Sequence, residues 1–121
     1  MRKLNIGTLK YTKVFATDKN EFSANHEYSI EGKLVDEKNC PTCVFAKISF
    51  QKGPIKEHGV NGCHNEDLIA IVIDRLQSLN QGDFKCRENS VAITKLEEAM
   101  MWLNKRTQDR LNRNVEGTSN K

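Results

Sequence analysis

The first fifty residues alternate between apolar and polar side chains in short runs. The clearest run is 44–51, where every second residue from Val44 to Phe50 is apolar and the residues between them form a second face. This period of two predicts a half-buried antiparallel strand. Shorter alternating runs near 11–15 and 28–32 predict two further strands, so we expect a small antiparallel sheet.

Polar segments separate these strands and predict turns. They are the sequences TDKN at 17–20 and DEKN at 36–39, while Gly53 with Pro54 ends the last strand. The glycine-rich run at 53–62 offers backbone N–H groups that could hold phosphate oxygens, but it lacks the glycine order of a P-loop. A structural connection is therefore the favoured interpretation.

From Asn65 onward the apolar spacing becomes that of a helix. Asn65 is the expected N-cap, and Glu66 and Asp67 suit the positive N-terminal end of the helix dipole. One face carries an apolar stripe formed by Leu68, Val72, Leu76 and Leu79. Three isoleucines widen this stripe beyond what one partner helix covers, namely Ile69, Ile71 and Ile73. Gly82 is the expected stop.

A second, longer helix is predicted from about Arg87 to Arg113, and it completes an αα-hairpin. At about 100° of rotation per residue, one stripe of this helix contains Asn89, Ala92, Leu96, Ala99, Leu103, Arg106 and Arg110. We interpret Trp102 and the two methionines before it, Met100 and Met101, as packing residues.

Together these patterns predict an α+β fold. A small N-terminal antiparallel β-sheet and its connecting loop occupy 1–62, and the helical hairpin with a C-terminal tail occupies 63–121. We expect the hairpin to mediate oligomerisation, because its first helix carries more apolar surface than one partner helix covers.

Composition and charge narrow the class of function. The chain has 37% hydrophobic and 29% charged residues, and it contains neither the about 20 consecutive apolar residues of a membrane span nor the core of a signal peptide. We therefore expect it in the cytoplasm. The net charge of +3 is too small for a non-specific DNA binder, yet 105–121 carries five basic residues against Asp109 and Glu116. This local excess favours a compact anionic ligand.

Two arginines on the second helix are candidate ligand-binding residues. Arg106 and Arg110 lie about 6 Å apart along the axis and could clamp a diphosphate, or they could simply favour the negative helix C-terminus and extend into solvent. Asn89 offers an amide that can pair with a base edge, but about 25 Å of helix separates it from Arg106. Two antiparallel hairpins would bring Asn89 of one chain opposite both arginines of the other, in two symmetric pockets.

Several segments together resemble one protein family. They are FQKGPIKE at 50–57, GVNG at 59–62, NEDL at 65–68, FKCREN at 84–89, LEEA at 96–99, WL at 102–103, RT at 106–107, Arg110 and VEGT at 115–118. In order and spacing they are similar to the first type of phage Thoeris anti-defence protein. The resemblance is strong over 45–121 and loose over the N-terminal sheet.

The resemblance implies a signal sponge and not an enzyme. Such proteins bind cyclic ADP-ribose isomers, among them glycocyclic ADP-ribose, which bacterial TIR-domain proteins make, and hold them uncleaved in the cytoplasm of the infected host bacterium. Relatives share the hairpin with sponges against the CBASS system, and some bind cyclic di- or trinucleotides at separate sites while assembling from dimers into hexamers. The resemblance implies no cofactor, no metal, no membrane and no DNA or RNA polymer.

The same resemblance assigns roles to individual residues of this chain. It places Asn89 against the adenine base and places Arg106 and Arg110 against the diphosphate. The aromatic residue that stacks on the base in the family falls at Leu79, a departure that removes stacking worth about 1–3 kcal/mol and changes affinity or isomer preference. Phe84 in the nearby loop either substitutes for this aromatic or anchors its own loop.

Cysteines and histidines leave weaker alternatives open. Cys40 and Cys43 form a CxxC pair that, with Cys63, His64 or Cys86, would complete a zinc site. A redox pair and ordinary reduced cysteines in a turn are the other interpretations. The absence of a regularly spaced second pair in the sequence favours reduced cysteines, and the histidines lack the spacing of a catalytic triad or a helical metal pair.

Three classes of function remain from the residues themselves. The first is a ligand-binding sponge, the second is a phosphodiesterase that degrades the same signal, and the third is a hairpin that binds nucleic acid through Arg106, Arg110 and Arg113. An enzyme needs a general base or metal carboxylates near the clamp, and Asp109 is rotated by about 100° from Arg110 around the helix. This arrangement favours the sponge.

Overall fold

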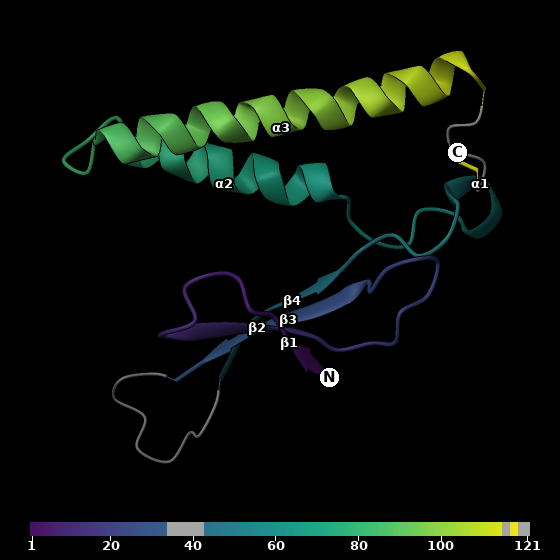
Figure 1. The fold of residues 1–121 in the computed structure, drawn as a ribbon, viewed down its shortest axis with the longest axis horizontal. Coiled ribbons are helices and arrows are strands. Elements are labelled where there is room, and N and C mark those ends of the chain that lie inside the picture. The colour runs from purple at the N-terminus through teal and green to yellow at the C-terminus, as the bar shows by residue number, and fades with distance from the viewer. Residues whose placement is uncertain (34–42, 115–116, 119–121) are drawn as a thin grey trace. The chain divides into compact units, whose positions relative to one another are not determined.

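A computed structural model describes residues 1–33, 43–114 and 117–118 of the 121-residue chain. In this described part, four strands precede three helices (Figure 1). The chain divides into two compact units, Met1–Cys63 and His64–Lys121. The predicted fold class is confirmed, since an antiparallel sheet is followed by a helical hairpin.

The first unit is built on one antiparallel sheet whose strands are ordered as in the chain. Its strands are β1 (Arg2–Lys3), β2 (Thr12–Ala16), β3 (Glu27–Gly32) and β4 (Cys43–Ser49). The three predicted strands are present as β2, β3 and β4, with small shifts at their ends. The pattern misses β1, because a strand of 2 residues leaves no alternation to detect. The turn predicted at 36–39 lies outside the described residues.

The alternation along β4 holds up to a bulge. Over the C-terminal half of the strand, half-buried and exposed residues alternate as predicted. The register then shifts, because Ile30 pairs with Ala46 whereas Glu31 pairs with Val44. This β-bulge makes Phe45 an extra residue, and its side chain is half-exposed.

The loop between β2 and β3 is organised by Asp18. Its carboxylate accepts hydrogen bonds from the backbone N–H of His26 (3.0 Å) and from the side-chain amide of Asn25 (3.2 Å). Desolvation raises the pKa of Asp18, but the hydrogen bonds, including one from the backbone of Glu27, outweigh it and lower the pKa below its ordinary value. The polar turn predicted at 17–20 therefore binds, through Asp18, the residues that directly precede β3.

The connection that leaves the sheet contains a short helix, α1 (Ile55–His58), which the sequence pattern does not predict. Two side-chain amides hold the loop together. Asn61 binds both backbone groups of Lys52, each at 2.8 Å, and Gln51 donates to the backbone oxygen of Gly59 at 2.8 Å. The loop satisfies these backbone groups internally, which supports a structural connection over a phosphate-binding loop.

The second unit is the hairpin of two antiparallel helices, α2 (Asn65–Leu79) and α3 (Arg87–Asn112), which pack along each other (Figure 1). The predicted N-cap is wrong by one residue. His64 caps α2, because the Asp67 carboxylate accepts the backbone N–H of His64 at 2.8 Å. None of the described helices is both long and apolar enough to cross a membrane.

Asn80 fixes the hairpin turn. Its side-chain oxygen accepts the N–H of Cys86 (3.1 Å), and its amide donates to the hydroxyl of Ser90 (2.9 Å). Helix α2 therefore ends at Leu79, ahead of the predicted stop at Gly82, which lies within the turn.

One face of α3 forms the seam of the hairpin. Its half-buried residues are Asn89, Ala92, Ile93, Leu96, Ala99, Met100, Leu103, Thr107 and Arg110. The predicted stripe differs at Arg106, which is exposed, while Thr107 is half-buried in its place. The predicted stripe alternates steps of three and four, an average of 3.5 that drifts by about 20° per seven residues from a helix of about 3.6 residues per turn. The step of four from Leu103 to Thr107 corrects this drift.

Candidate functional site

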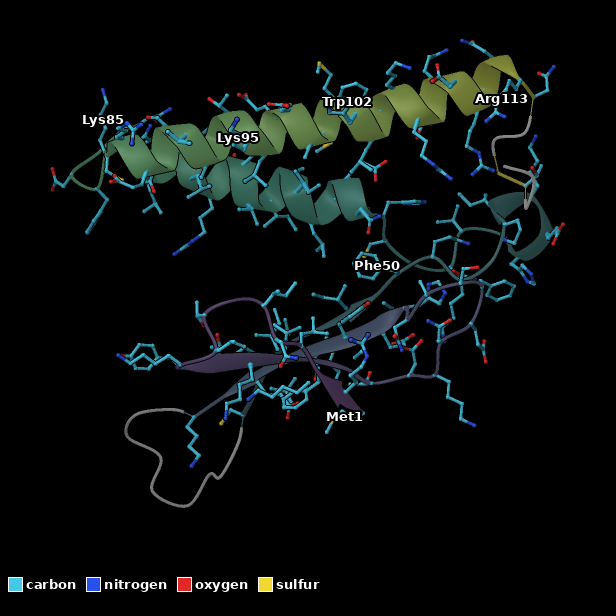
Figure 2. The ribbon with its side chains drawn as sticks, in the orientation of Figure 1. Met1, Phe50, Lys85, Lys95, Trp102 and Arg113 are labelled. Atoms are coloured by element: carbon cyan, nitrogen blue, oxygen red, sulfur yellow. The ribbon has the colours of Figure 1, made fainter. Side chains whose placement is uncertain are left out.

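The C-terminal part of α3 carries a surface hollow, called here the basic concavity. It has a volume of about 350 Å³ and is lined by Trp102, Lys105, Arg106, Asp109, Arg110 and Arg113. These residues recur at intervals of three or four, so successive helical turns place them on one side of α3. Figure 2 shows the stretch of α3 between Trp102 and Arg113. Helix α3 thus provides one wall of a pocket.

The charge of the basic concavity is positive. Lys105 Nζ lies 2.9 Å from a carboxylate oxygen of Asp109, in an exposed ion pair one turn apart. Arg110 Nη2 donates to the backbone oxygen of Thr118 (2.9 Å), a contact that leaves the guanidinium charge in place. The lining residues include three arginines and one lysine but only one acidic residue, so this surface attracts anions.

Both arginines predicted as a clamp line the same concavity. Arg106 is exposed and Arg110 is half-buried. Guanidinium groups one helical turn apart offer several N–H donors in fixed forks, an arrangement that suits the oxygens of a diphosphate. The arrangement is compatible with a clamp, and the binding role of the two residues stays a prediction.

The other predicted ligand residues lie at the turn end of the hairpin. Leu79 is the half-buried last residue of α2, and Phe84 in the turn is 73% exposed. Asn89 is half-buried in the first turn of α3, where its side-chain amide donates to the backbone oxygen of Phe84 (3.1 Å). About 25 Å of helix separates Asn89 from Arg106, so one hairpin does not bring the two groups of residues together.

Among the residues that the structure describes, no group of three or more His, Cys, Asp or Glu could hold a metal ion. Cys86 is the N-cap of α3, and its Sγ accepts the backbone N–H of Asn89 at 3.4 Å. Cys40 lies outside the described residues, so the suggested pair with Cys43 stays a hypothesis.

Sequence reasoning misses Trp102 as a lining residue; it counts Lys105 only in the local basic excess and names Arg113 only in the nucleic-acid alternative. The packing role predicted for Trp102 and Met101 is not seen within one chain, because each side chain is 59% exposed. Met100 is half-buried, as predicted. Helical spacing is the signal that could have found Trp102, since it precedes Arg106 by one turn and therefore points to the same side.

Asp109 lines the same surface as the candidate clamp, as expected from its position three residues after Arg106. It is rotated by about 100° from Arg110 around the helix, a difference that long side chains span. The carboxylate of Asp109 is engaged by Lys105.

Comparison with known proteins places the chain in a family. Residues 44–108 match the family model described as Acb2/Tad1, hairpin domain, a range that includes β4 except its first residue, α2, Asn89 and Arg106. The chain is also 47% identical over 131 aligned residues to Thoeris anti-defense 1 of Bacillus phage SBSphiJ7, and the alignment covers 93% of this chain and 92% of that protein. The chain therefore belongs to the Thoeris anti-defence 1 (Tad1) family and carries its Acb2/Tad1 hairpin domain.

Proposed function

We propose that this protein is a phage anti-defence sponge that binds cyclic ADP-ribose isomers, such as glycocyclic ADP-ribose, and holds them uncleaved. The observation that carries the proposal is the position of Arg106 and Arg110 on one basic concavity. The relative from Bacillus phage SBSphiJ7 is named for action against Thoeris defence, which supports a Thoeris signal as the ligand. A small molecule with a diphosphate suits this surface, because paired guanidinium groups bind phosphate oxygens through charge-assisted hydrogen bonds.

The proposed pocket forms between two copies of the hairpin. Arg106 and Arg110 of one copy hold the diphosphate, and Asn89 of the second copy contacts the adenine edge. Leu79 and Phe84 of the second copy cover the base by apolar contact. This arrangement joins residues that a single chain keeps about 25 Å apart.

Exposed apolar residues on α2 support self-association. Ile71 is 63% exposed and Val72 is 45% exposed, while the neighbouring Ile69 and Ile73 are half-buried. A second hairpin that buries such residues gains roughly 25 cal/mol for each Å² of apolar surface removed from water. We propose that hairpin dimers form in this way and build further to a hexamer.

Binding energy alone is sufficient for sequestration. A ligand of about 35 heavy atoms at about 0.3 kcal/mol per atom reaches about −11 kcal/mol, which corresponds to a nanomolar complex. Each arginine contributes about 1.5–3 kcal/mol through charge-assisted hydrogen bonds. A sponge of this affinity removes the signal without a chemical step or a cofactor.

A phosphodiesterase that degrades the same signal is the alternative function. Its general base would have to reach the diphosphate, and Asp109 is the acidic residue that lines the concavity. The ammonium group of Lys105 engages this carboxylate at 2.9 Å, so a general-base role would require Asp109 to leave this ion pair. The ion pair therefore favours capture over cleavage.

Three further expectations belong to the same proposal. The matched domain is named for both Acb2 and Tad1, which supports additional binding of CBASS cyclic di- or trinucleotides at separate sites. The protein acts in the cytoplasm of the infected bacterium, where these signals are made. The sheet region (1–62) and the hairpin region (63–121) act as separate domains, the second of which holds the signal.

Calorimetric titration with TIR-produced cyclic ADP-ribose isomers tests the proposal, followed by heating and chromatography of the released molecule. We expect tight binding and recovery of the intact ligand. Recovery of an altered product would establish an enzyme, and the absence of binding would refute the sponge for this signal. A steep loss of affinity with salt would instead indicate a nucleic-acid binder, because a closed pocket loses affinity only mildly.

Sedimentation tests the intermolecular pocket independently of the ligand. We expect dimers or larger assemblies at micromolar protein concentration. A monomer under these conditions would remove the shared pocket, because Asn89 and Arg106 of one chain are about 25 Å apart.

A further inference from the structure

Trp102 is exposed at a place where a tryptophan is costly to leave in water. Its side chain on α3 (Figure 2) is 59% exposed. It lines the basic concavity together with Arg106 and Arg110. An indole is among the largest apolar side chains, and uncovered apolar surface is unfavourable in proportion to its area. This exposure is best explained by a molecule that covers Trp102 when it binds.

The spacing of Trp102 and the arginines fits a ligand with a flat ring beside its phosphates. Trp102 and Arg106 are one helical turn apart, about 6 Å along the axis of α3. An aromatic ring and a cationic group therefore line the same surface, and these two kinds of group recognise a nucleotide base and its phosphates.

The second hairpin of the proposed pocket does not by itself account for the exposure of Trp102. To cover Trp102 without a ligand, a second polypeptide would have to approach across Arg106, Arg110 and Arg113, which line the same concavity, whereas Lys105 there is already paired with Asp109. Burying cations without matching anions costs more than covering the indole gains. A small molecule that supplies both the ring and the negative charge meets both demands at once.

We propose that Trp102 is a specificity-determining residue whose indole stacks on the base of the bound nucleotide while Arg106 and Arg110 hold the diphosphate. The inference rests on the proposed function, because it places the ligand in the same concavity. It adds a requirement that the arginines alone do not impose. The ligand must carry a planar base within about one helical turn of its phosphates, so a diphosphate without a base binds weakly.

The wild-type protein itself offers the first test. The sequence contains 1 tryptophan, so intrinsic fluorescence reports Trp102 without a label. We expect titration with a cyclic ADP-ribose isomer, corrected for ligand absorbance, to quench the emission and to saturate at the same ligand concentration as the calorimetric heat. Unchanged emission at a concentration that saturates the heat would overturn the stacking proposal and leave the sponge standing. Absence of both signals would overturn both.

Two substitutions separate stacking from simple apolar contact. Trp102→Leu keeps apolar bulk but lacks a planar ring, and we expect it to raise the Kd by roughly 5- to 150-fold. Trp102→Phe keeps an aromatic face, so its Kd is expected to stay within about fivefold of the wild-type value. Wild-type affinity in Trp102→Leu, or an equal loss in both variants, would overturn the proposal.

Met101 provides the matched control. It is exposed to the same extent, 59%, and directly precedes Trp102, but it does not line the basic concavity. Met101→Ala should therefore bind the ligand with wild-type affinity. Thermal melting and sedimentation of all three variants establish that the fold and the assembly are retained, so that a change in Kd reports the contact with the ligand.

Discussion

The carboxylate of Asp109 lies 2.9 Å from the ammonium group of Lys105, one turn away on the same side of α3. This ion pair neutralises the lysine that lines the basic concavity, so the remaining cations of that surface are all guanidinium groups. Guanidinium groups bind phosphate oxygens in bidentate geometry, whereas an ammonium group acts as a point charge. The pair therefore shapes the surface towards recognition of a diphosphate by arginine.

Replacing Arg106 or Arg110 with alanine is expected to weaken capture of a cyclic ADP-ribose isomer. A charge-assisted hydrogen bond is worth about 1.5–3 kcal/mol, so each variant should raise the Kd by about 10- to 150-fold. Calorimetric titration measures the change, and circular dichroism shows whether the hairpin is intact. Arg75→Ala, at an exposed position on α2, is the control. Wild-type affinity in both concavity variants would refute the clamp.

Asp109→Asn removes a negative charge from the concavity and keeps the size of the side chain. We expect ligand binding to tighten by about two- to fivefold, because an exposed charge interaction contributes up to about 1 kcal/mol. The loss of the ion pair should lower the free energy of unfolding by only about 0.3–0.5 kcal/mol. Chromatography of the ligand after incubation distinguishes the alternative function. A product made by the wild-type protein but not by this variant would identify Asp109 as a catalytic base.

Asn80→Ala is expected to destabilise the hairpin through its turn. The substitution removes the acceptor of the Cys86 N–H and the donor to Ser90, two hydrogen bonds worth about 1 kcal/mol each. Urea denaturation should show a loss of about 1–2 kcal/mol in the free energy of unfolding. Gln81→Ala, at the exposed neighbouring position, should be close to neutral. Equal stability of the two variants would show that Asn80 does not hold the turn.

Asp18 is expected to make the sheet unit sensitive to acid. Its pKa is lowered in the folded protein, so the carboxylate stabilises the fold above its unfolded pKa of about 3.8 and loses this contribution as the pH falls further. The melting temperature of the wild-type protein should therefore fall more steeply below about pH 4 than that of Asp18→Asn. Asp83→Asn, in the hairpin turn, is the control. Parallel pH profiles for the wild-type protein and Asp18→Asn would contradict this role.

Regular elements are predictable from the residues alone, but their ends are not. Apolar spacing identifies α2 and α3, and alternation identifies three of the strands. The errors occur where one hydrogen bond decides the boundary. The Asp67 carboxylate moves the N-cap to His64, and the side chain of Asn80 ends α2 before Gly82. Which of two neighbouring polar residues caps or ends a helix does not change the spacing of the apolar residues, so this spacing does not predict the helix ends.

The basic residues of the candidate site are predictable from the sequence, but the exposure of Trp102 is not. The spacing of Arg106 and Arg110 places them together, and the structure puts both on one surface. Trp102 at helical spacing predicts packing, yet it lies about 100° around α3 from the seam residue Leu103 and is 59% exposed. Apolar spacing does not distinguish a tryptophan that packs within the chain from one that faces outward, because both have the same periodicity.

The single uninterrupted helix that carries both Asn89 and Arg106 also restricts how the chain can change in length. Inserting or deleting one residue between them would shift Arg106 by about 1.5 Å along the axis and turn it by about 100° away from its present direction. Two full turns, about seven residues, are needed before the direction is nearly restored. Substitution of α3 residues outside the concavity, Asn89 excepted, is thus compatible with the site, whereas single-residue insertions and deletions between Asn89 and Arg106 are not.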